Sequence, residues 1–303
     1  MRFIIPQTKN PPFFHVVIML QWTPMNESDP FPQLREIPQR PKRLYTNGTL
    51  PADGTKFLAV VGSRKYSPYG KAACEHLIAG LRGYPVSIIS GLALGIDTIA
   101  HRAALDAGLH TIAVPGSGLG EKVLYPATNR RLAQEIVEKG GLLLSEYEPD
   151  FRATVWSFPK RNRIMAGLSH AVLIVEAHER SGTLITARMA LDYNRDVLAI
   201  PGSIFSDGSS GTNTLLRQGA TLVRTADDIL DALGIEKRAA ESEQDLSDLS
   251  THEQTVMIAL IEPLSKDEII RSNILETEDL SAALTLLEIK GLIKESGGKI
   301  YRI

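Results

Sequence analysis

Between Phe158 and Ala187 the chain places polar side chains on both sides of an apolar run typical of a buried strand, 171–175. Four consecutive side chains precede that run: Lys160, Arg161, Asn162 and Arg163. The residues that follow it are Ser181, Gly182 and Thr183, ahead of a helical pattern that begins near Leu184. A strand that ends in a small-residue turn at a helix N-terminus directs backbone N–H groups toward an anion. Because three of the four preceding side chains are cationic, the segment predicts a site for a phosphate backbone.

Two further turns of this kind lie upstream. The run 57–61 ends in Gly62, Ser63 and Arg64, and helical periodicity follows over 69–81. The run 86–89 ends in Ser90 and Gly91, and a helix is expected over 98–107. Glycine in such a turn allows a ligand to approach the backbone where a Cβ would collide. Three turns on the carboxyl side of predicted parallel strands converge on one edge of a sheet.

The central part of the chain alternates apolar runs with helical patterns. The runs are 57–61, 86–89, 110–114, 142–144, 171–175, 197–200 and 220–223. Strands that alternate with helices require crossover connections, and they predict an α/β fold with a mostly parallel, doubly wound sheet. Near-continuous apolar strands fit a sheet that is covered on both faces.

A series of motifs in this order resembles the DprA/Smf family of DNA-processing proteins: VGSR, SGLALGIDTIAH, PGSGL, YP(x)2N at 125–129, LLSEYEP, FPKRNRIMAGL, EAHERSGTLITA and AIPGSI. The resemblance runs from about Asp29 to Leu233. It implies a Rossmann-like domain that binds single-stranded DNA and helps load the RecA recombinase, notably in natural transformation. It also implies a homodimer through that domain, and it adds Asn129 to the expected DNA-binding residues.

Arginine suits a phosphate site because its planar guanidinium binds phosphate bidentately and stacks on bases. Arg64 follows a strand at a Gly-Ser turn, where the alternative to phosphate binding is a solvated side chain or a salt bridge. For Arg161 and Arg163, the alternative is that one of them holds Glu146 or Glu148 in a structural ion pair.

Aromatic residues near these cations are candidate stacking platforms for bases, although aromatic residues near turns are more often part of a core. The candidates are Tyr125, Phe158 and Trp156. Asp97 and His101 share one helix face and could form a catalytic pair. The favoured interpretation is that Asp97 caps a helix and His101 fills a polar pocket.

An enzyme is the alternative interpretation of the whole chain. Phosphoribohydrolases of related fold carry a signature resembling PGGxGTxxE, and Gly182-Thr183 matches its GT. The next signature position is Thr186 instead of a carboxylate, although Glu176 and Glu179 lie nearby. The turn at 62–64 is not G-x-G-x-x-G, which disfavours a dehydrogenase. The sequence therefore predicts a non-enzymatic DNA-binding protein without a cofactor.

Composition places limits on these interpretations. The net charge of −2 over 303 residues requires any nucleic-acid contact to use a local basic patch. The single cysteine, Cys74, excludes an internal disulfide and fits a reducing cytoplasm. The eight-residue apolar stretch 13–20 is too short to span a bilayer, and no Cys/His cluster has zinc-ligand spacing. A cytoplasmic protein without metal or membrane anchor is expected.

The sequence also predicts how the chain is divided into domains. Residues 1–28 are expected to form a poorly ordered arm or an extra strand, and prolines predict irregular chain up to residue 50. The Rossmann-like domain is assigned to 51–236 and a polar linker to 237–250. Helical patterns near 251–261, 265–271 and 277–290 and a terminal hairpin predict a winged helix over 251–303.

That C-terminal module carries six Lys/Arg and nine Asp/Glu, which leaves a net charge of −3. Its presumed recognition helix contains four carboxylates: Glu276, Glu278, Asp279 and Glu288. A helix that reads duplex DNA needs cations to meet phosphates. A role in protein contacts or packing is therefore favoured over groove reading.

Overall fold

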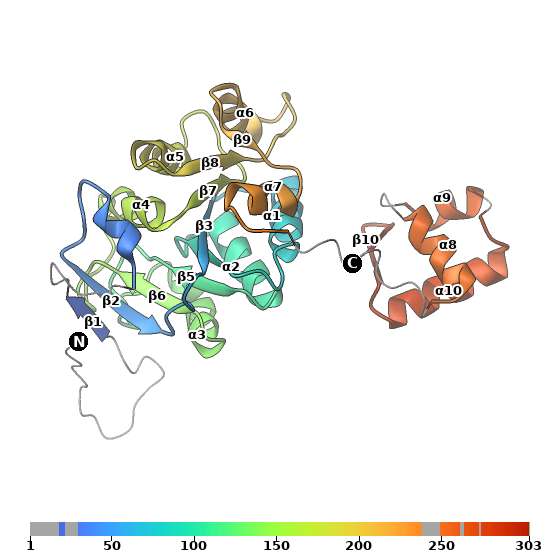
Figure 1. Ribbon diagram of the computed structural model, residues 1–303, viewed down its shortest axis with the longest axis horizontal. Coiled ribbons are helices and arrows are strands. Elements are labelled where there is room, and N and C mark those ends of the chain that lie inside the picture. Colours follow the sequence, from blue (N-terminus) through green and yellow to red (C-terminus); the bar gives the residue numbers. More distant parts are fainter. Residues whose placement is uncertain (1–17, 22–29, 238–248, 261–263, 273, 303) are drawn as a thin grey trace, which may run out of the picture. The chain divides into compact units, whose positions relative to one another are not determined.

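The computed structural model describes residues 18–21, 30–237, 249–260, 264–272 and 274–302 (Figure 1). The chain divides into two compact units, Met1–Glu236 and Lys237–Ile303. Each unit has its own hydrophobic core.

The first unit is built on a nine-stranded sheet with the order β1-β2-β6-β5-β4-β3-β7-β8-β9. The strands are β1 (Ile18–Gln21), β2 (Arg43–Gly48), β3 (Lys56–Val61), β4 (Val86–Ser90), β5 (His110–Ala113), β6 (Leu142–Ser145), β7 (Ala171–Ile174), β8 (Asp196–Ala199) and β9 (Thr221–Leu222). The strands from β3 to β9 are parallel to one another, while β2 is antiparallel to β6 and to β1. The predicted α/β fold with a mostly parallel sheet is confirmed, and each of the seven predicted runs contains a strand.

The expectation of irregular chain up to residue 50 was wrong for 43–48, because β2 pairs with β6 and belongs to the α/β unit. Four successive residues of β2 are buried: Leu44, Tyr45, Thr46 and Asn47. Half of these residues are polar, so β2 lacks the continuous apolar run by which the other strands are recognised. The prolines that favoured irregular chain all precede β2, and Pro32 begins the 3-10 helix η1 (Pro32–Arg35).

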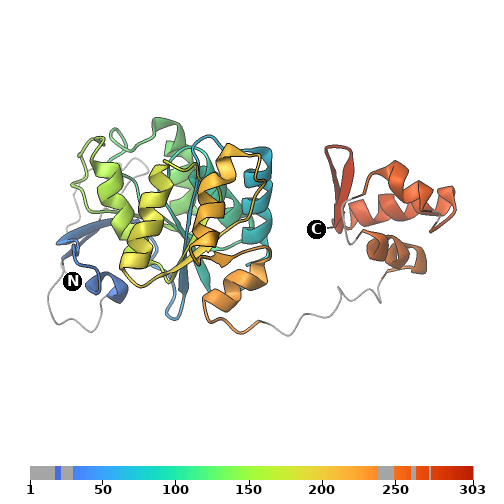
Figure 2. The ribbon, with the colours of Figure 1, turned by 90° about the horizontal axis from the view of Figure 1, so that it is seen from above.

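Helices cover both faces of the sheet (Figure 2). One face packs against α1 (Pro68–Ala79), α2 (Ile96–Asp106), α3 (Arg130–Glu138) and α7 (Ala226–Ala232). The other face packs against η1, α4 (Ser157–Leu168), α5 (Gly182–Asp192) and α6 (Ser210–Arg217). Short 3-10 turns, η2 (Ala127–Asn129) and η3 (Asp207–Ser209), precede α3 and α6. Cys74 lies on α1 and is buried in the core.

The strand order reverses between β3 and β7. From β3 the chain proceeds outward through β4, β5 and β6, and it then returns to place β7 on the opposite side of β3. In doubly wound sheets, ligands bind beyond the carboxyl ends of the strands near such a reversal. The loops that leave β3, β4, β5, β6 and β7 therefore form the edge at which a site is expected.

The second unit contains α8 (Thr251–Ala259), α9 (Lys266–Arg271), α10 (Thr277–Ile289) and the hairpin of β10 (Ile293–Ser296) and β11 (Lys299–Arg302). Three helices followed by a hairpin form the predicted winged helix. Its core gathers apolar residues from all three helices and the hairpin. Ser250 and Glu253 form a capping box at the start of α8, and the buried Glu253 carboxylate also binds Lys290 Nζ at 2.7 Å.

Candidate nucleic-acid interface

A small hollow of about 40 Å³ lies at the carboxyl edge of the sheet, on the side of β3 that leads to β4 and β5. It is lined by Arg64, Gly91, Ala93, Leu94, Tyr125, Pro126, Phe158 and Arg161. These residues come from the loops after β3, β4 and β5 and from the first turns of α4. The predicted convergence of turns on one edge thus brings Arg64, Gly91, Tyr125, Phe158 and Arg161 together.

The mouth of the hollow combines an exposed cation with two aromatic rings. The guanidinium carbon of Arg64 lies 5.6 Å from the centre of the Phe158 ring. The Tyr125 and Phe158 ring centres are 5.5 Å apart, and Tyr125 is 49% exposed. A guanidinium held over an aromatic face keeps its outward N–H groups free for a phosphate, and exposed rings can stack on bases. The arrangement fits a single nucleic-acid strand.

The floor of the hollow carries a buried positive charge. Arg161 is 4% exposed, and its Nη1 donates hydrogen bonds to the carbonyl oxygens of Gly91 and Val114. Burial lowers the pKa of Arg161 to about 10, partly opposed by the nearby Asp97 carboxylate, so the group stays cationic at neutral pH. The Arg161 guanidinium thus fixes the loops after β4 and β5 and contributes charge from beneath, while its direct contact with a phosphate stays a prediction.

Asp97 and His101 are both buried, and each is bound to different neighbours. Asp97 accepts hydrogen bonds from the backbone N–H groups of Gly91 and Ala93 at 3.1 and 3.3 Å, and burial raises its pKa. His101 Nδ1 lies 2.8 Å from Thr111 Oγ1, and burial lowers the pKa of the imidazole to about 3. The expected polar pocket for His101 is confirmed, but the expectation that Asp97 caps a helix was wrong: the N-cap of α2 is Gly95, and Asp97 in the first turn instead holds the loop after β4.

Arg163 lies outside the hollow, and its contact with a phosphate stays a prediction. It is 3% exposed, donates to Glu146 and to the Gln39 carbonyl oxygen, and so forms the structural ion pair that was the alternative. Asn162 is half-buried and accepts a hydrogen bond from Arg161 Nε at 3.2 Å. Lys160, by contrast, is exposed, with Nζ 5.8 and 5.9 Å from the ring centres of Tyr147 and Trp156.

Three further predicted contact residues use their side chains within the loops. Ser90 Oγ donates to Val60 O at 2.7 Å, and Ser63 Oγ donates to Lys65 O at 2.7 Å. Asn129 Nδ2 donates to Leu92 O and lies within 2.8 Å of Thr98 Oγ1. All three side chains are buried, so they position the turns around the hollow. At Gly62 an added Cβ would lie 2.7 Å from the Ile96 side chain, which explains the glycine by packing.

The turn after β7 begins α5 at Gly182, two residues before the predicted start. Ser181 is the N-cap, and its hydroxyl accepts a hydrogen bond from Thr183 N at 3.1 Å. Gly182 is exposed, while Thr183 is 9% exposed. Because β7 lies on the other side of β3, none of these three residues lines the hollow.

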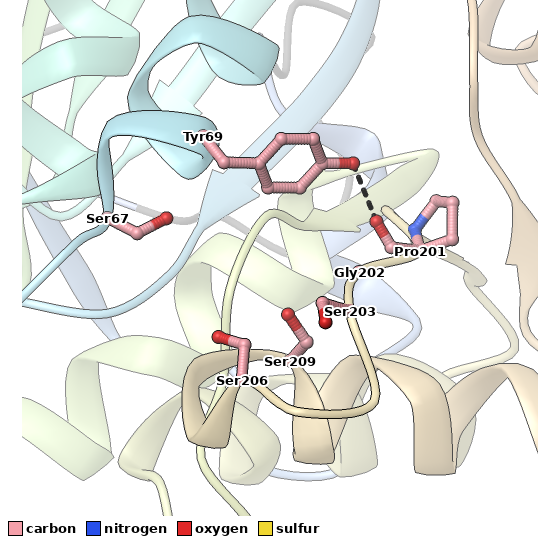
Figure 3. Close-up of a pocket in the computed structure, with 7 residues that line it drawn as sticks. All are labelled: Ser67, Tyr69, Pro201, Gly202, Ser203, Ser206 and Ser209. Atoms are coloured by element: carbon pink, nitrogen blue, oxygen red, sulfur yellow. Dashed lines mark hydrogen bonds between the residues drawn. The ribbon is translucent and has the colours of Figure 1, made fainter.

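A larger pocket of about 500 Å³ lies near the loop after β8 (Figure 3). Figure 3 shows Ser67 and Tyr69 on one side and the segment 201–209 on the other, and the Tyr69 hydroxyl donates to Pro201 O at 2.7 Å. Glu176, one carboxylate of the enzyme alternative, is 3% exposed and accepts hydrogen bonds from the backbone and hydroxyl of Ser67. In this arrangement Glu176 anchors the start of α1, and Glu179 is exposed.

The sequence interpretation missed Ala93, Leu94 and Pro126 as lining residues. All three belong to quoted motifs, SGLALG and YP, and Leu94 is 49% exposed in a tight turn. An apolar residue in such a turn was the available signal.

Among the described residues, no group of His, Cys, Asp or Glu is arranged to hold a metal ion, and no helix is long and apolar enough to cross a membrane.

A doubly wound, mostly parallel sheet with a cationic and aromatic hollow at its carboxyl edge, followed by a winged helix, defines a Rossmann-like protein with an added winged-helix unit. The family model described as DNA recombination-mediator protein A matches residues 22–234, and the DprA winged helix domain matches 239–299. The chain belongs to this family, DprA/Smf.

Individual relatives agree with this membership. The chain is 46% identical over 206 residues to Protein Smf of Escherichia coli, covering 67% of this chain and 54% of that protein. It is 48% identical over 199 residues to DNA processing protein DprA of Streptococcus pneumoniae, covering 65% and 68%. The chain therefore spans about half the length of the Escherichia coli relative.

Two solved structures share the fold. The crystal structure of DprA from Streptococcus pneumoniae matches with a TM-score of 0.66 and 42% identity, over 75% of this chain and 77% of that one. The DprA structure from Helicobacter pylori matches with a TM-score of 0.61 and 33% identity, over 71% of this chain and 95% of that one. That protein is described by its single-stranded DNA binding mode.

Proposed function

We propose that this chain binds single-stranded DNA in the hollow at the carboxyl edge of its sheet. The observation that carries the proposal is the exposed Arg64 guanidinium over the Phe158 ring, with Tyr125 beside it. Arg64 and the nearby Lys160 meet phosphates, while the rings stack on one or two bases. Such contacts tolerate any sequence, because every base has a stacking face.

The geometry favours a single strand over a duplex. The hollow of about 40 Å³ admits the edge of one base or one phosphate group, whereas the bases of a duplex are already stacked on each other. The loops around the hollow are held in place by six of the predicted residues: Gly62, Ser63, Ser90, Gly91, Asn129 and Asn162. The residues Ser181, Gly182 and Thr183 stay candidates for a phosphate farther along the edge, beyond β7.

The proposed cellular role follows from family membership and from the single-stranded DNA binding of the Helicobacter pylori relative. The protein helps to load the RecA recombinase onto single strands during DNA processing and natural transformation, in the cytoplasm. It acts as a homodimer through the Rossmann-like unit, so that two hollows engage one longer strand. Binding of RecA to the purified protein, and light scattering after gel filtration, test these two parts.

The proposed role is non-enzymatic. The alternative, a nucleotide-processing enzyme related to phosphoribohydrolases, draws on the pocket in Figure 3 and the buried Glu176 beside it. Incubation with nucleoside monophosphates and with DNA, with and without divalent metals, is expected to give no hydrolysis. Turnover above blank that disappears in Glu176→Gln, with Glu179→Gln as the exposed control, would establish the enzyme instead.

Fluorescence anisotropy with single- and double-stranded oligonucleotides of equal length tests the DNA-binding proposal. The single strand is expected to bind at least about tenfold more tightly, a difference of about 1.4 kcal/mol. Equal affinities, or tighter binding of the duplex, would refute a single-strand site.

A further inference from the structure

A second, larger hollow of about 410 Å³ lies next to the start of β2. We call it the basic groove, because five cationic side chains line it: Arg40, Lys42, Arg43, Lys160 and Arg163. Its carboxylates are Glu146 and Glu148, and the largely buried Tyr45 and Tyr147 complete its lining. Positive charge is thus in excess in the groove, although the whole chain has a net charge of −2.

The topology of the sheet places the basic groove at the same edge as the small hollow lined by Arg64, Phe158 and Arg161, which we call the Arg64 hollow. β2 runs antiparallel to β6, and Tyr45 near the start of β2 pairs with Ser145 at the end of β6. The segment before β2, which carries Arg40, Lys42 and Arg43, therefore lies beyond the carboxyl end of β6. The edge continues in one row from the loop after β3, through those after β4 and β5, to the start of β2.

The residues 156–161 connect the two hollows. Phe158 and Arg161 line the Arg64 hollow, and Lys160 between them in sequence lines the basic groove. Trp156 is 55% exposed, and Lys160 Nζ lies 5.9 Å from the centre of its ring. A cation beside an exposed aromatic ring repeats the combination of Arg64 and Phe158, so a strand that leaves the hollow meets a second stacking and phosphate position.

The acidic side chains do not cancel the positive charge of the groove. Glu146 binds the buried Arg163, and its other oxygen lies 3.8 Å from Nζ of Lys160, whose side chain is 46% exposed. Glu148 lies 3.4 Å from Arg43, but both side chains are more than half exposed. Exposed pairs of this kind contribute little to stability, so either partner can exchange the other for a new one. The guanidinium of Arg43 can therefore turn from Glu148 to a phosphate, and Lys42 is exposed in the same segment.

We propose that the basic groove binds the phosphate backbone of the same single strand beyond the Arg64 hollow, so that the strand runs from Arg64 across Trp156 and Lys160 to Lys42 and Arg43. This inference rests on the proposed function and adds the path of the strand and a second set of contacts. The exposed ring of Trp156 favours nucleic acid over an acidic protein segment, since bases stack on such rings.

The test compares Lys42→Ala/Arg43→Ala with wild type, using oligo(dT) strands of about 4 and about 16 nucleotides. The long strand is expected to bind about tenfold more weakly to the variant, and its log-affinity against log-salt slope is expected to fall by about 1.4, at about 0.7 per lost phosphate contact. The short strand, which is expected to engage the Arg64 hollow without reaching Lys42 and Arg43, is expected to keep its affinity within about twofold.

The matched control is Arg82→Ala/Lys139→Ala. Both residues are exposed and lie at helix ends on the opposite, amino edge of the sheet, and the change in net charge is the same. Unchanged long-strand affinity in Lys42→Ala/Arg43→Ala, or an equal loss in the control, would overturn the groove. Unchanged DNA affinity with lost binding of polyglutamate would replace the strand by an acidic protein segment and also overturn it. If wild type fails to bind either strand, the proposed function itself fails.

Discussion

Gly91→Ala is expected to destabilise the first unit, because Gly91 lies directly against the buried guanidinium of Arg161. A Cβ on Gly91 would be 2.1 Å from Arg161 Nη1 and 2.5 Å from Cζ and Nη2. Arg161 cannot move away freely, since it is 4% exposed and bonded to two carbonyl oxygens. Relief of the overlap requires the loss of at least one hydrogen bond to a charged group, at about 1.5–3 kcal/mol, in addition to local repacking.

The expected destabilisation is therefore about 2–4 kcal/mol. For a unit of this size each kcal/mol lowers the midpoint of thermal unfolding by about 2–4 °C, so Gly91→Ala is expected to lower Tm by about 4–16 °C. Differential scanning calorimetry on the purified variant measures this. The effect on single-strand binding should be measured well below Tm, because a displaced Arg161 also disturbs the floor of the hollow.

A double-mutant cycle with Arg161→Met separates the steric effect from any general cost of the extra methyl group. The methionine side chain is not planar and lacks the donors, so it can yield to the new Cβ, and Gly91→Ala is expected to cost much less in that background. Coupling of at least about 1 kcal/mol is expected for residues in such contact. A Gly91→Ala variant with unchanged Tm, or full additivity in the cycle, would refute the packing argument.

Three further predictions follow from named side chains. Phe158→Leu is expected to weaken single-strand binding about 5- to 150-fold, because about 1–3 kcal/mol of base stacking is lost. Fluorescence anisotropy measures this loss, with Phe205→Leu at an exposed position as the control. Equal effects of the two substitutions would contradict stacking at Phe158. His101 has a folded-state pKa of about 3 against an unfolded value of about 6.5. The unfolded chain therefore binds the proton at a higher pH than the folded chain, and the free energy of unfolding falls as the pH falls from about 6.5 toward about 3. His101→Gln should show a smaller loss of Tm than wild type between about pH 7 and pH 5. An identical loss would contradict this assignment. A chain ending at Glu236 should stay folded and keep its single-strand affinity within about tenfold. The reason is that the removed winged helix, residues 251–303, has a net charge of −3. A larger loss of affinity would show that the winged helix holds DNA.

The sequence predicted the parallel strands well because their residues are continuously apolar, and it failed at β2 because Thr46 and Asn47 are polar and buried. The positions of Arg64, Tyr125 and Phe158 were predictable, since each follows a strand of the parallel sheet on its carboxyl side. The different environments of Lys160, Arg161 and Arg163 could not be predicted from the sequence. They depend on the rotation of α4 about its axis, which buries Arg161 and Arg163 and leaves Lys160 exposed.

Burial also decides which polar residues of the motifs serve the loops. Ser90 and Asn129 belong to motifs as conspicuous as VGSR, yet both donate to backbone carbonyl oxygens inside the fold. A hydroxyl or amide at a turn can satisfy either a ligand or the turn itself. The choice depends on tertiary packing, which a pattern of residue types along the chain does not contain.

The measurement that tests the central claim most directly is the salt dependence of single-strand binding by Arg64→Ala, compared with Arg82→Ala. Arg64 is exposed at the mouth of the hollow, whereas Arg82 is exposed after α1 at the other edge of the sheet, so the two variants lose the same charge at different places. Arg64→Ala is expected to weaken binding clearly and to lower the log-affinity against log-salt slope by about 0.7, with Tm unchanged. Arg82→Ala is expected to match wild type. An Arg64→Ala variant with wild-type affinity and slope would contradict the placement of the strand at this hollow.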